Sequence, residues 1–194
     1  MIKLNGKKET KIAVFISGRG SNLQNLIKYS KNHNSKFKIS LIVSNKSKAL
    51  GLNFAKKFNI KKKIINFNNS KLMEKNLILS LKKEKINIIC LAGFMKVLSK
   101  NFIKKFNGKI LNIHPSLLPK YKGLNTHERA IKNKDRFAGA SIHKVTEKLD
   151  SGKVILQKKV KILKSDNVRS LEKKVLKIEH EIYPKAIDKF LTNL

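Results

Sequence analysis

Short apolar runs alternate with amphipathic segments along much of this chain, and that alternation constrains its fold most. The runs KIAVFIS (residues 11–17) and INIICLA (residues 86–92) are apolar and rich in β-branched residues. Such runs are typical of parallel strands buried on both faces. LQNLIKYS, which follows the first run, has its apolar residues at helical spacing instead. The order predicts an α/β fold in a single domain, residues 1–194, with an open, mostly parallel twisted sheet and helices on both faces.

The segment LNIHPSLLPKYKGLNTHERAI, residues 111–131, begins as a strand and breaks at Pro115. Asn112 and His114 are two residues apart, so they project from the same face of an extended chain. Pro115 cannot continue a hydrogen-bonded ladder, so the chain leaves the sheet where His114 is presented. A carboxamide and an imidazole there can donate hydrogen bonds and move protons at one carbonyl centre. Ordinary strand-end hydrogen bonding is the alternative interpretation.

A glycine turn, GRGSN, separates the first predicted strand from the first predicted helix. Strand, glycine turn and helix together place backbone N–H groups where a phosphate can bind. The turn lacks the dinucleotide fingerprint, because Leu23 occupies the third glycine position and the second predicted strand ends in Ser44 and Asn45 without an acidic residue. The turn alone therefore leaves phosphate binding and a purely structural role both open.

The second half of the chain predicts two late, hairpin-like strands, residues 138–146 and 153–162, joined by a turn containing Asp150. An aspartate before glycine usually makes a local hydrogen bond. Thr126 is expected to cap a helix in which His127 has a structural role, and His143 is expected to support the site. Asp166 or Ser170 is expected to cap a last helix, residues 171–191, that Pro184 kinks or breaks.

Three motifs taken together resemble one enzyme family. GRGSN (residues 18–22), NIHPSLLPKYKGLNTH (residues 112–127) and LDSGKVILQ (residues 149–157) resemble the folate-dependent phosphoribosylglycinamide formyltransferases of purine synthesis. The similarity runs in order from about residue 11 to about residue 183. HPSLLP occurs in other 10-formyltetrahydrofolate enzymes, whereas the three motifs together are far more specific. The resemblance implies a Rossmann-like formyltransferase fold. A cytoplasmic location is also expected.

The resemblance also implies a mechanism and a set of site residues. An amine of glycinamide ribonucleotide attacks the formyl carbon of 10-formyltetrahydrofolate, and Asn112 and protonated His114 stabilise the tetrahedral oxyanion while Asp150 keeps His114 charged. No metal is required. The implied residues are, for catalysis, Asn112, His114 and Asp150; for the ribonucleotide, Gly20, Ser21, Asn22 and Glu179; and for the folate, Met95, Lys96, Val97, Leu98, Asn112 and a basic residue at or near Lys71.

The amino-acid composition limits which classes of function and which cellular compartment are expected for this chain. The net charge of +33 would suit a nucleic-acid binder, but only four of the 45 basic residues are arginine, the residue most used for forked base and phosphate contacts. Lysines spread along the whole chain indicate a solvated surface, with at most non-specific binding of nucleic acid. The single cysteine, Cys90, lies inside a predicted strand and suits a reducing cytoplasm. No targeting segment and no membrane span are expected.

Three rival functions stay open at this point. Methionyl-tRNA formyltransferase and formyltetrahydrofolate deformylase share the Asn-x-His core that this chain resembles, but each normally carries an additional domain. A basic, non-enzymatic nucleic-acid-binding protein is the rival from a different class, and it leaves Asn112, His114 and Asp150 without a shared purpose. Oligomeric state, monomer or homodimer, is not determined by any of these patterns.

Overall fold

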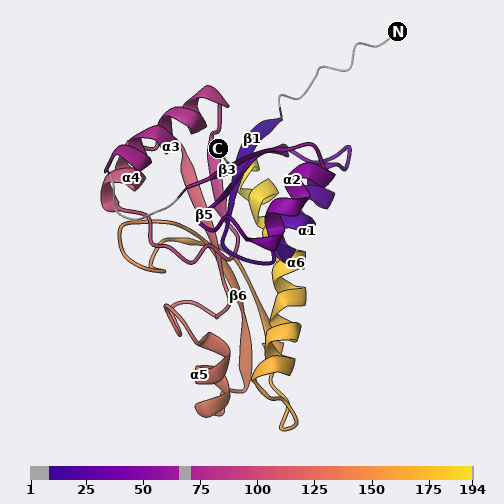
Figure 1. Ribbon diagram of the computed structural model, residues 1–194. Helices are drawn as coiled ribbons and strands as arrows, with labels where there is room; N and C mark the ends of the chain where they lie inside the picture. Colours follow the sequence, from indigo (N-terminus) through magenta and orange to yellow (C-terminus); the bar gives the residue numbers. More distant parts are fainter. Residues whose placement is uncertain (1–8, 66–70, 194) are drawn as a thin grey trace.

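A computed structural model describes residues 9–65 and 71–193, without the side chain of Lys71. Within these residues one sheet has the strand order β3-β2-β1-β4-β5-β6-β7. The pairs from β3 to β5 are parallel, whereas β5–β6 and β6–β7 are antiparallel. The predicted open, mostly parallel α/β sheet is therefore confirmed (Figure 1). The strands are β1 (Thr10–Ile16), β2 (Phe37–Ser44), β3 (Lys61–Ile64), β4 (Ile88–Leu91), β5 (Lys109–His114), β6 (Phe137–Lys144) and β7 (Val154–Lys161).

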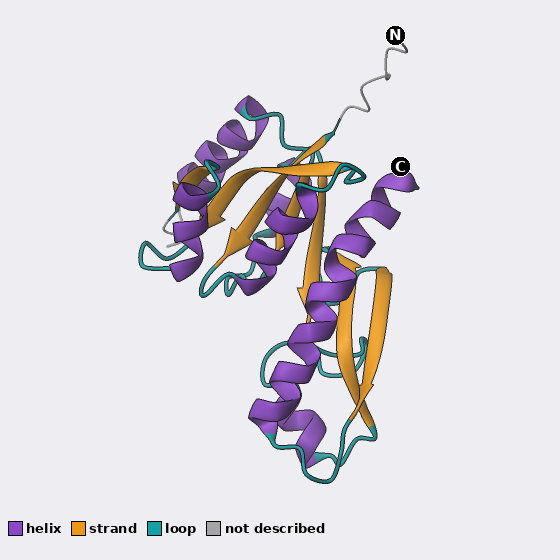
Figure 2. Ribbon diagram, turned by 90° about the vertical axis from the view of Figure 1, so that its right-hand side faces the viewer, coloured by secondary structure: helices purple, strands orange, loops and turns teal. Residues whose placement is uncertain are grey.

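Helices cover both faces of this sheet. In Figure 1, α3 and α4 lie on one side of the strands, and α1 and α6 lie on the other. Figure 2 shows α6 as a long helix running beside the late antiparallel strands. The helices are α1 (Ser21–Ser30), the short 3₁₀ helix η1 (Leu50–Leu52), α2 (Asn53–Lys57), α3 (Lys71–Lys83), α4 (Lys100–Lys105), α5 (Thr126–Lys132) and α6 (Val168–Thr192).

The sheet separates two hydrophobic clusters, and the interior strand β1 contributes to both. Ile12, Val14 and Ile16 are fully buried in one cluster, with the apolar faces of α1 and α6. Ala13 and Phe15, which point the other way, are fully buried in the second cluster with α3 and α4. Successive side chains of a strand alternate between faces, so a run with no polar residue must be covered on both sides. The uniformly apolar IAVFI part of the KIAVFIS run thus explains why the sheet is covered on both faces at β1.

The last helix differs from the sequence prediction at its start and at Pro184. Asn167 caps α6, in place of Asp166 or Ser170: its side chain accepts from the Ser170 N–H at 2.9 Å, and Ser170 Oγ accepts from the Asn167 N–H at 3.1 Å. The cap takes an extended backbone and satisfies otherwise unpaired N–H groups. The prediction of a break at Pro184 is wrong, because α6 continues through Pro184 to Thr192.

The start of α5 also corrects a prediction. Asn125, with φ 58°, is the N-cap residue, and Thr126 is already the first helical residue with a buried side chain. Asparagine tolerates the left-handed conformation better than threonine, whose β-branch disfavours it. The cap is therefore displaced by one residue because the preceding loop enters the helix through a left-handed turn.

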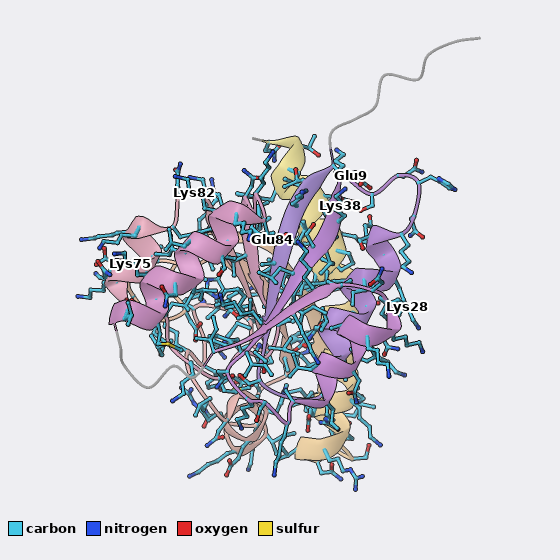
Figure 3. All side chains as sticks on the ribbon, turned by 45° about the horizontal axis from the view of Figure 1, so that its top comes forward. Glu9, Lys28, Lys38, Lys75, Lys82 and Glu84 are labelled. Atoms are coloured by element: carbon cyan, nitrogen blue, oxygen red, sulfur yellow. The ribbon has the colours of Figure 1, made fainter. Side chains whose placement is uncertain are left out.

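The surface carries the excess of lysine. In Figure 3 the labelled Lys28, Lys75 and Lys82 lie on the outside of the molecule, and all three are exposed. The edge strand β3 has the sequence KKKI, and lysines on an edge strand discourage pairing with another chain. None of the helices within the described residues is long and apolar enough to cross a membrane.

Candidate active site

A cleft of about 1000 Å³ opens at the carboxyl ends of the central strands. The chain order reverses between β1 and β4, and ligands of open α/β sheets bind at such a point. The loops after β1, β4 and β5 contribute to the cleft, together with one face of α6. Among the residues expected at the site, the following line it: Gly20, Ser21, Asn22, Met95, Lys96, Val97, Leu98, Asn112, His114, Asp150 and Glu179. Lys71 begins α3, but its side chain lies outside the described part of the structure.

The three residues expected to be catalytic meet on one wall of this cleft. Asn112 and His114 project from the end of β5, and Asp150 comes from the turn that precedes β7. Asp150 Oδ2 lies 3.4 Å from His114 Nδ1, and the two side chains are only 8% and 7% exposed. Asp150 Oδ1 lies 3.5 Å from Asn112 Nδ2. A single carboxylate thus contacts both the imidazole and the carboxamide.

The His114 ring is held from both of its nitrogens. Nε2 lies 2.8 Å from the carbonyl oxygen of Tyr121, to which it donates, while Nδ1 faces the Asp150 carboxylate. Two oxygen acceptors around one imidazole accommodate the form with both nitrogens protonated. The arrangement therefore fixes the orientation of the His114 ring.

His143 occupies the position opposite Asn112 in the β5–β6 pair. Its Nδ1 donates to the carbonyl oxygen of Lys144 at 2.9 Å, so in the neutral ring Nε2 accepts from Asn112 Nδ2 at 3.1 Å. Nε2 also lies 3.5 Å from Asp150 Oδ1. His143 thus orients the carboxamide and the carboxylate, as a supporting residue would.

The carboxyl group of Asp150 is held in its ionised form. Burial alone would raise its pKa, but the hydrogen bond with His143, the N–H of Gly123 and the charges of His114 and His143 together lower it. The Gly123 N–H donates to Oδ2 at 2.9 Å. Asp150 has φ 44°, a left-handed conformation that is uncommon outside glycine and that clusters at functional sites.

The loop after Pro115 is fixed to the late strands, which explains why two distant motifs act together. Ser141 Oγ, on β6, donates to the Ser116 carbonyl at 2.6 Å and accepts from the Leu118 N–H at 3.1 Å. Gln157 Nε2, on β7, donates to Ser141 Oγ and to the Leu118 carbonyl at 2.7 and 3.0 Å. Gln157, the last residue of LDSGKVILQ, therefore holds the HPSLLP loop in place.

The glycine turn is shaped by the protein's own backbone. Gly20 has φ 75°, and a Cβ atom there would lie 2.8 Å from the Cα atom of Gly51 in η1. The Gly51 N–H also donates to the Gly18 carbonyl at 3.0 Å. At Gly18, by contrast, a Cβ atom would meet no described atom within 4 Å, and φ is not positive. Only Gly20 is therefore required by conformation and close approach.

Asn22 and Glu179 form a partly buried pair on the opposite wall. Asn22 Nδ2 donates to Glu179 Oε2 at 2.6 Å, while Asn22 Oδ1 is buried without a described partner. Burial raises the pKa of Glu179 against the lowering effect of the Asn22 hydrogen bond, and the charge of Glu172 raises it further. An unsatisfied carbonyl oxygen beside a desolvated carboxyl group is suited to hydroxyl or N–H donors from a ligand.

The segment after β4 supplies the apolar wall. The side chains of Met95 and Val97 line the cleft and are 64% and 78% exposed. Leu98 lines the cleft too, but most of it is buried in the cluster with α3 and α4. Large apolar side chains left exposed beside a cleft indicate a surface that a flat, apolar ligand can cover.

Several cleft residues could not be identified from the sequence. Arg19 and Glu172 line the mouth and approach one another at 3.6 Å. His127 also lines the cleft, and its pKa is lowered by burial. The only signal for Glu172 was its helical spacing of seven from Glu179. Within the described residues, no group of three or more His, Cys, Asp or Glu side chains has the arrangement to hold a metal ion.

The doubly covered sheet and the carboxamide–imidazole–carboxylate cleft define an α/β protein with side chains suited to proton transfer and oxyanion stabilisation. The chain belongs to the formyl transferase family, whose sequence model matches residues 10–187. It is 43% identical over 183 residues to a phosphoribosylglycinamide formyltransferase of Haemophilus influenzae, covering 93% of this chain and 86% of that protein.

Two further comparisons agree with this assignment. The chain is 42% identical to the human trifunctional purine biosynthetic protein adenosine-3, over 93% of this chain but only 18% of that much longer protein. The crystal structure of the phosphoribosylglycinamide formyltransferase from Brucella melitensis superposes with a TM-score of 0.89 at 39% identity, covering 94% of this chain and 96% of that one. The expected family is thus confirmed.

Proposed function

We propose that this chain transfers the formyl group of 10-formyltetrahydrofolate to the amine of glycinamide ribonucleotide, a step of purine biosynthesis. The observation that carries the proposal is that Asn112, His114 and Asp150 contact one another in the same cleft that the glycine turn and an exposed apolar wall also line. The cleft thus has a place for each part of the reaction: the ribonucleotide binds at the turn, the folate binds at the wall, and the reacting atoms lie at Asn112, His114 and Asp150.

The folate fits the wall that residues 95–98 form. The volume of about 1000 Å³ is at the upper end of the range for small-molecule sites. Met95 and Val97 offer apolar contacts to a pterin ring, and Lys96 supplies a positive charge for an anionic tail. The folate supplies the formyl group, and no other cofactor is invoked.

The ribonucleotide fits the turn and α6. The first N–H groups of α1 lack helical acceptors, so they can bind a phosphate at Gly20, Ser21 and Asn22. Glu179, with its desolvated carboxyl group, accepts hydrogen bonds from the ribose hydroxyls. The amine of the substrate then extends toward His114.

His114 and Asn112 then act on the carbonyl that the amine attacks. The charged imidazole of His114, whose N–H groups face Tyr121 and Asp150, stabilises the formyl oxygen electrostatically as negative charge develops on it. Asn112 donates through the amide hydrogen that now faces Asp150 at the long distance of 3.5 Å. Asp150, ionised at the start of the reaction, stabilises the charged imidazole and accepts the amine proton through a water molecule. The bond between the formyl carbon and the folate nitrogen then breaks, and that nitrogen takes up the proton.

One assay tests the proposal against its rivals. The protein is incubated with 10-formyltetrahydrofolate and either glycinamide ribonucleotide, methionyl initiator tRNA or water alone, and release of tetrahydrofolate is followed. We expect release only with the ribonucleotide, together with formation of the formylated product. Release with tRNA alone, or in water alone, would replace the proposal with methionyl-tRNA formyltransferase or deformylase activity.

A further inference from the structure

A buried hydroxyl group links the first strand to the loop that follows β4. Ser17 comes directly after β1 and directly before the glycine turn, and it is 5% exposed. Its Oγ accepts from the Met95 N–H at 2.7 Å, and its own N–H donates to the Gly93 carbonyl at 3.2 Å. Two hydrogen bonds from one residue therefore hold the segment that lines the apolar wall.

Asn45 fixes the direction of this hydroxyl group. The Ser17 O–H donates to Asn45 Oδ1 at 2.5 Å, from the first residue after β2. A hydroxyl carries one hydrogen, so donation to Asn45 leaves its lone pairs for the N–H of Met95. The ends of three adjacent strands, β2, β1 and β4, are joined in this way beneath the cleft.

The exposed side chains of the wall cannot supply the same constraint. Met95 and Val97 are largely exposed, so few packing contacts hold them. Phe94 anchors the segment from the other side, with its ring 5.4 Å from that of Phe15 in an edge-to-face arrangement. Ser17 holds the following residue, Met95, through its backbone, and a binding surface requires such fixed support.

We propose that Ser17, oriented by Asn45, is a positioning residue for the folate-binding wall, although it is adjacent in sequence to the phosphate-binding turn. The inference rests on the proposed function for the identity of the ligand. It predicts a separation of effects: loss of the hydroxyl group loosens the folate site and leaves the ribonucleotide site in place, because the backbone bond to Gly93 and the turn itself are retained.

The test is steady-state kinetics of formyl transfer with Ser17→Ala. We expect the KM for 10-formyltetrahydrofolate to rise about three- to tenfold, the effect of one hydrogen bond, and the KM for the ribonucleotide to change less than about twofold. Calorimetric titration with tetrahydrofolate should give a matching change in Kd. Asn45→Ala should act in the same direction more weakly, because it frees the hydroxyl without removing it.

Two control variants separate positioning from general stability. Ser17→Thr keeps the hydroxyl group and should restore most of the folate affinity. Ser44→Ala removes another buried hydroxyl group at the carboxyl ends of the strands. Among the described residues this hydroxyl group bonds only to Lys46. The substitution should therefore leave both KM values unchanged. An unchanged folate KM in Ser17→Ala, or an equal rise for both substrates, would overturn the inference. If the wild-type protein itself showed no formyl transfer, the proposed function would be refuted instead.

Discussion

Asn25 on α1 donates from Nδ2 to the carbonyl oxygen of His180 on α6 at 2.5 Å. In a regular helix that carbonyl would accept from the N–H four residues later, but residue 184 is proline and has no N–H. The side chain of one helix thus supplies the hydrogen bond that the other helix lacks. This explains how α6 continues through Pro184 without the break that was one of the two expected outcomes; a kink there stays a prediction.

Replacing Asn25 by alanine should therefore destabilise the fold. A partly buried carbonyl without a donor costs about 1–3 kcal/mol in the free energy of unfolding, measured by urea denaturation. Pro184→Ala provides the control, because it restores an N–H to the helix. In that background Asn25→Ala should cost clearly less, and additive effects of the two substitutions would contradict the explanation.

His114→Ala should abolish formyl transfer and leave ribonucleotide binding mostly intact, because the imidazole acts on the developing oxyanion and lies away from the glycine turn. Asn112→Ala should lower kcat by about two to three orders of magnitude, as loss of one oxyanion donor does. Initial rates and calorimetric titration with the ribonucleotide measure the two effects. More than about half of the wild-type kcat in either variant would remove that residue from the oxyanion role.

The glycine turn should respond differently at its two glycines. Gly20→Val introduces a Cβ atom 2.8 Å from Gly51 at a positive φ, so it should lower the melting temperature and raise the ribonucleotide KM more than the folate KM. Gly18→Ala is the matched control, because no described atom lies within 4 Å of its Cβ position, and its melting temperature should be unchanged. Equal changes in both KM values for Gly20→Val would indicate general unfolding of the turn.

The sequence predicted the parts of this molecule that local patterns encode. The strand KIAVFIS, the GRGSN turn and the Asn-x-His strand end are read from spacing and residue type alone. The contact between Gly20 and Gly51 and the bond from Asn25 to His180 join segments that are far apart in the chain. Their residue types carry no local signal, because each is required only by the partner that the fold brings to it.

The pH dependence of the free energy of unfolding should show that the ionised form of Glu179 destabilises the fold relative to the protonated form. Its raised pKa means that its favourable contribution is complete below its ordinary value of 4.5 and is lost as pH rises through the folded-state pKa. Glu179→Gln should therefore be more stable than wild type at about pH 7, and the difference should shrink toward about pH 4. Urea denaturation across that range measures it.

Glu181, two residues further along α6, provides the control of opposite sign. Hydrogen bonds from Lys158 and Lys185 lower its pKa, so its contribution is present above the ordinary value of 4.5 and lost as pH falls. Glu181→Gln should consequently be slightly less stable than wild type near neutral pH and equal to it in acid. The same pH slope for both variants would show that at least one of the two carboxyl groups does not behave as described.

The charge of +33 should act on small anions and on nucleic acid in different ways. The lysines lie on solvated faces, as Lys28, Lys75 and Lys82 do in Figure 3, and the four arginines are too few to build a base-reading surface. Filter binding of DNA and RNA at about 150 mM salt should therefore be weak and without sequence preference, with a steep dependence on salt. For the anionic ribonucleotide, kcat/KM should fall as salt rises, to the extent that association limits the rate. An uncharged osmolyte at matched osmolality is the control that distinguishes screening from a change in water activity. Tight, sequence-selective binding at that salt concentration would make nucleic acid a second ligand and formyl transfer an incomplete description of this protein.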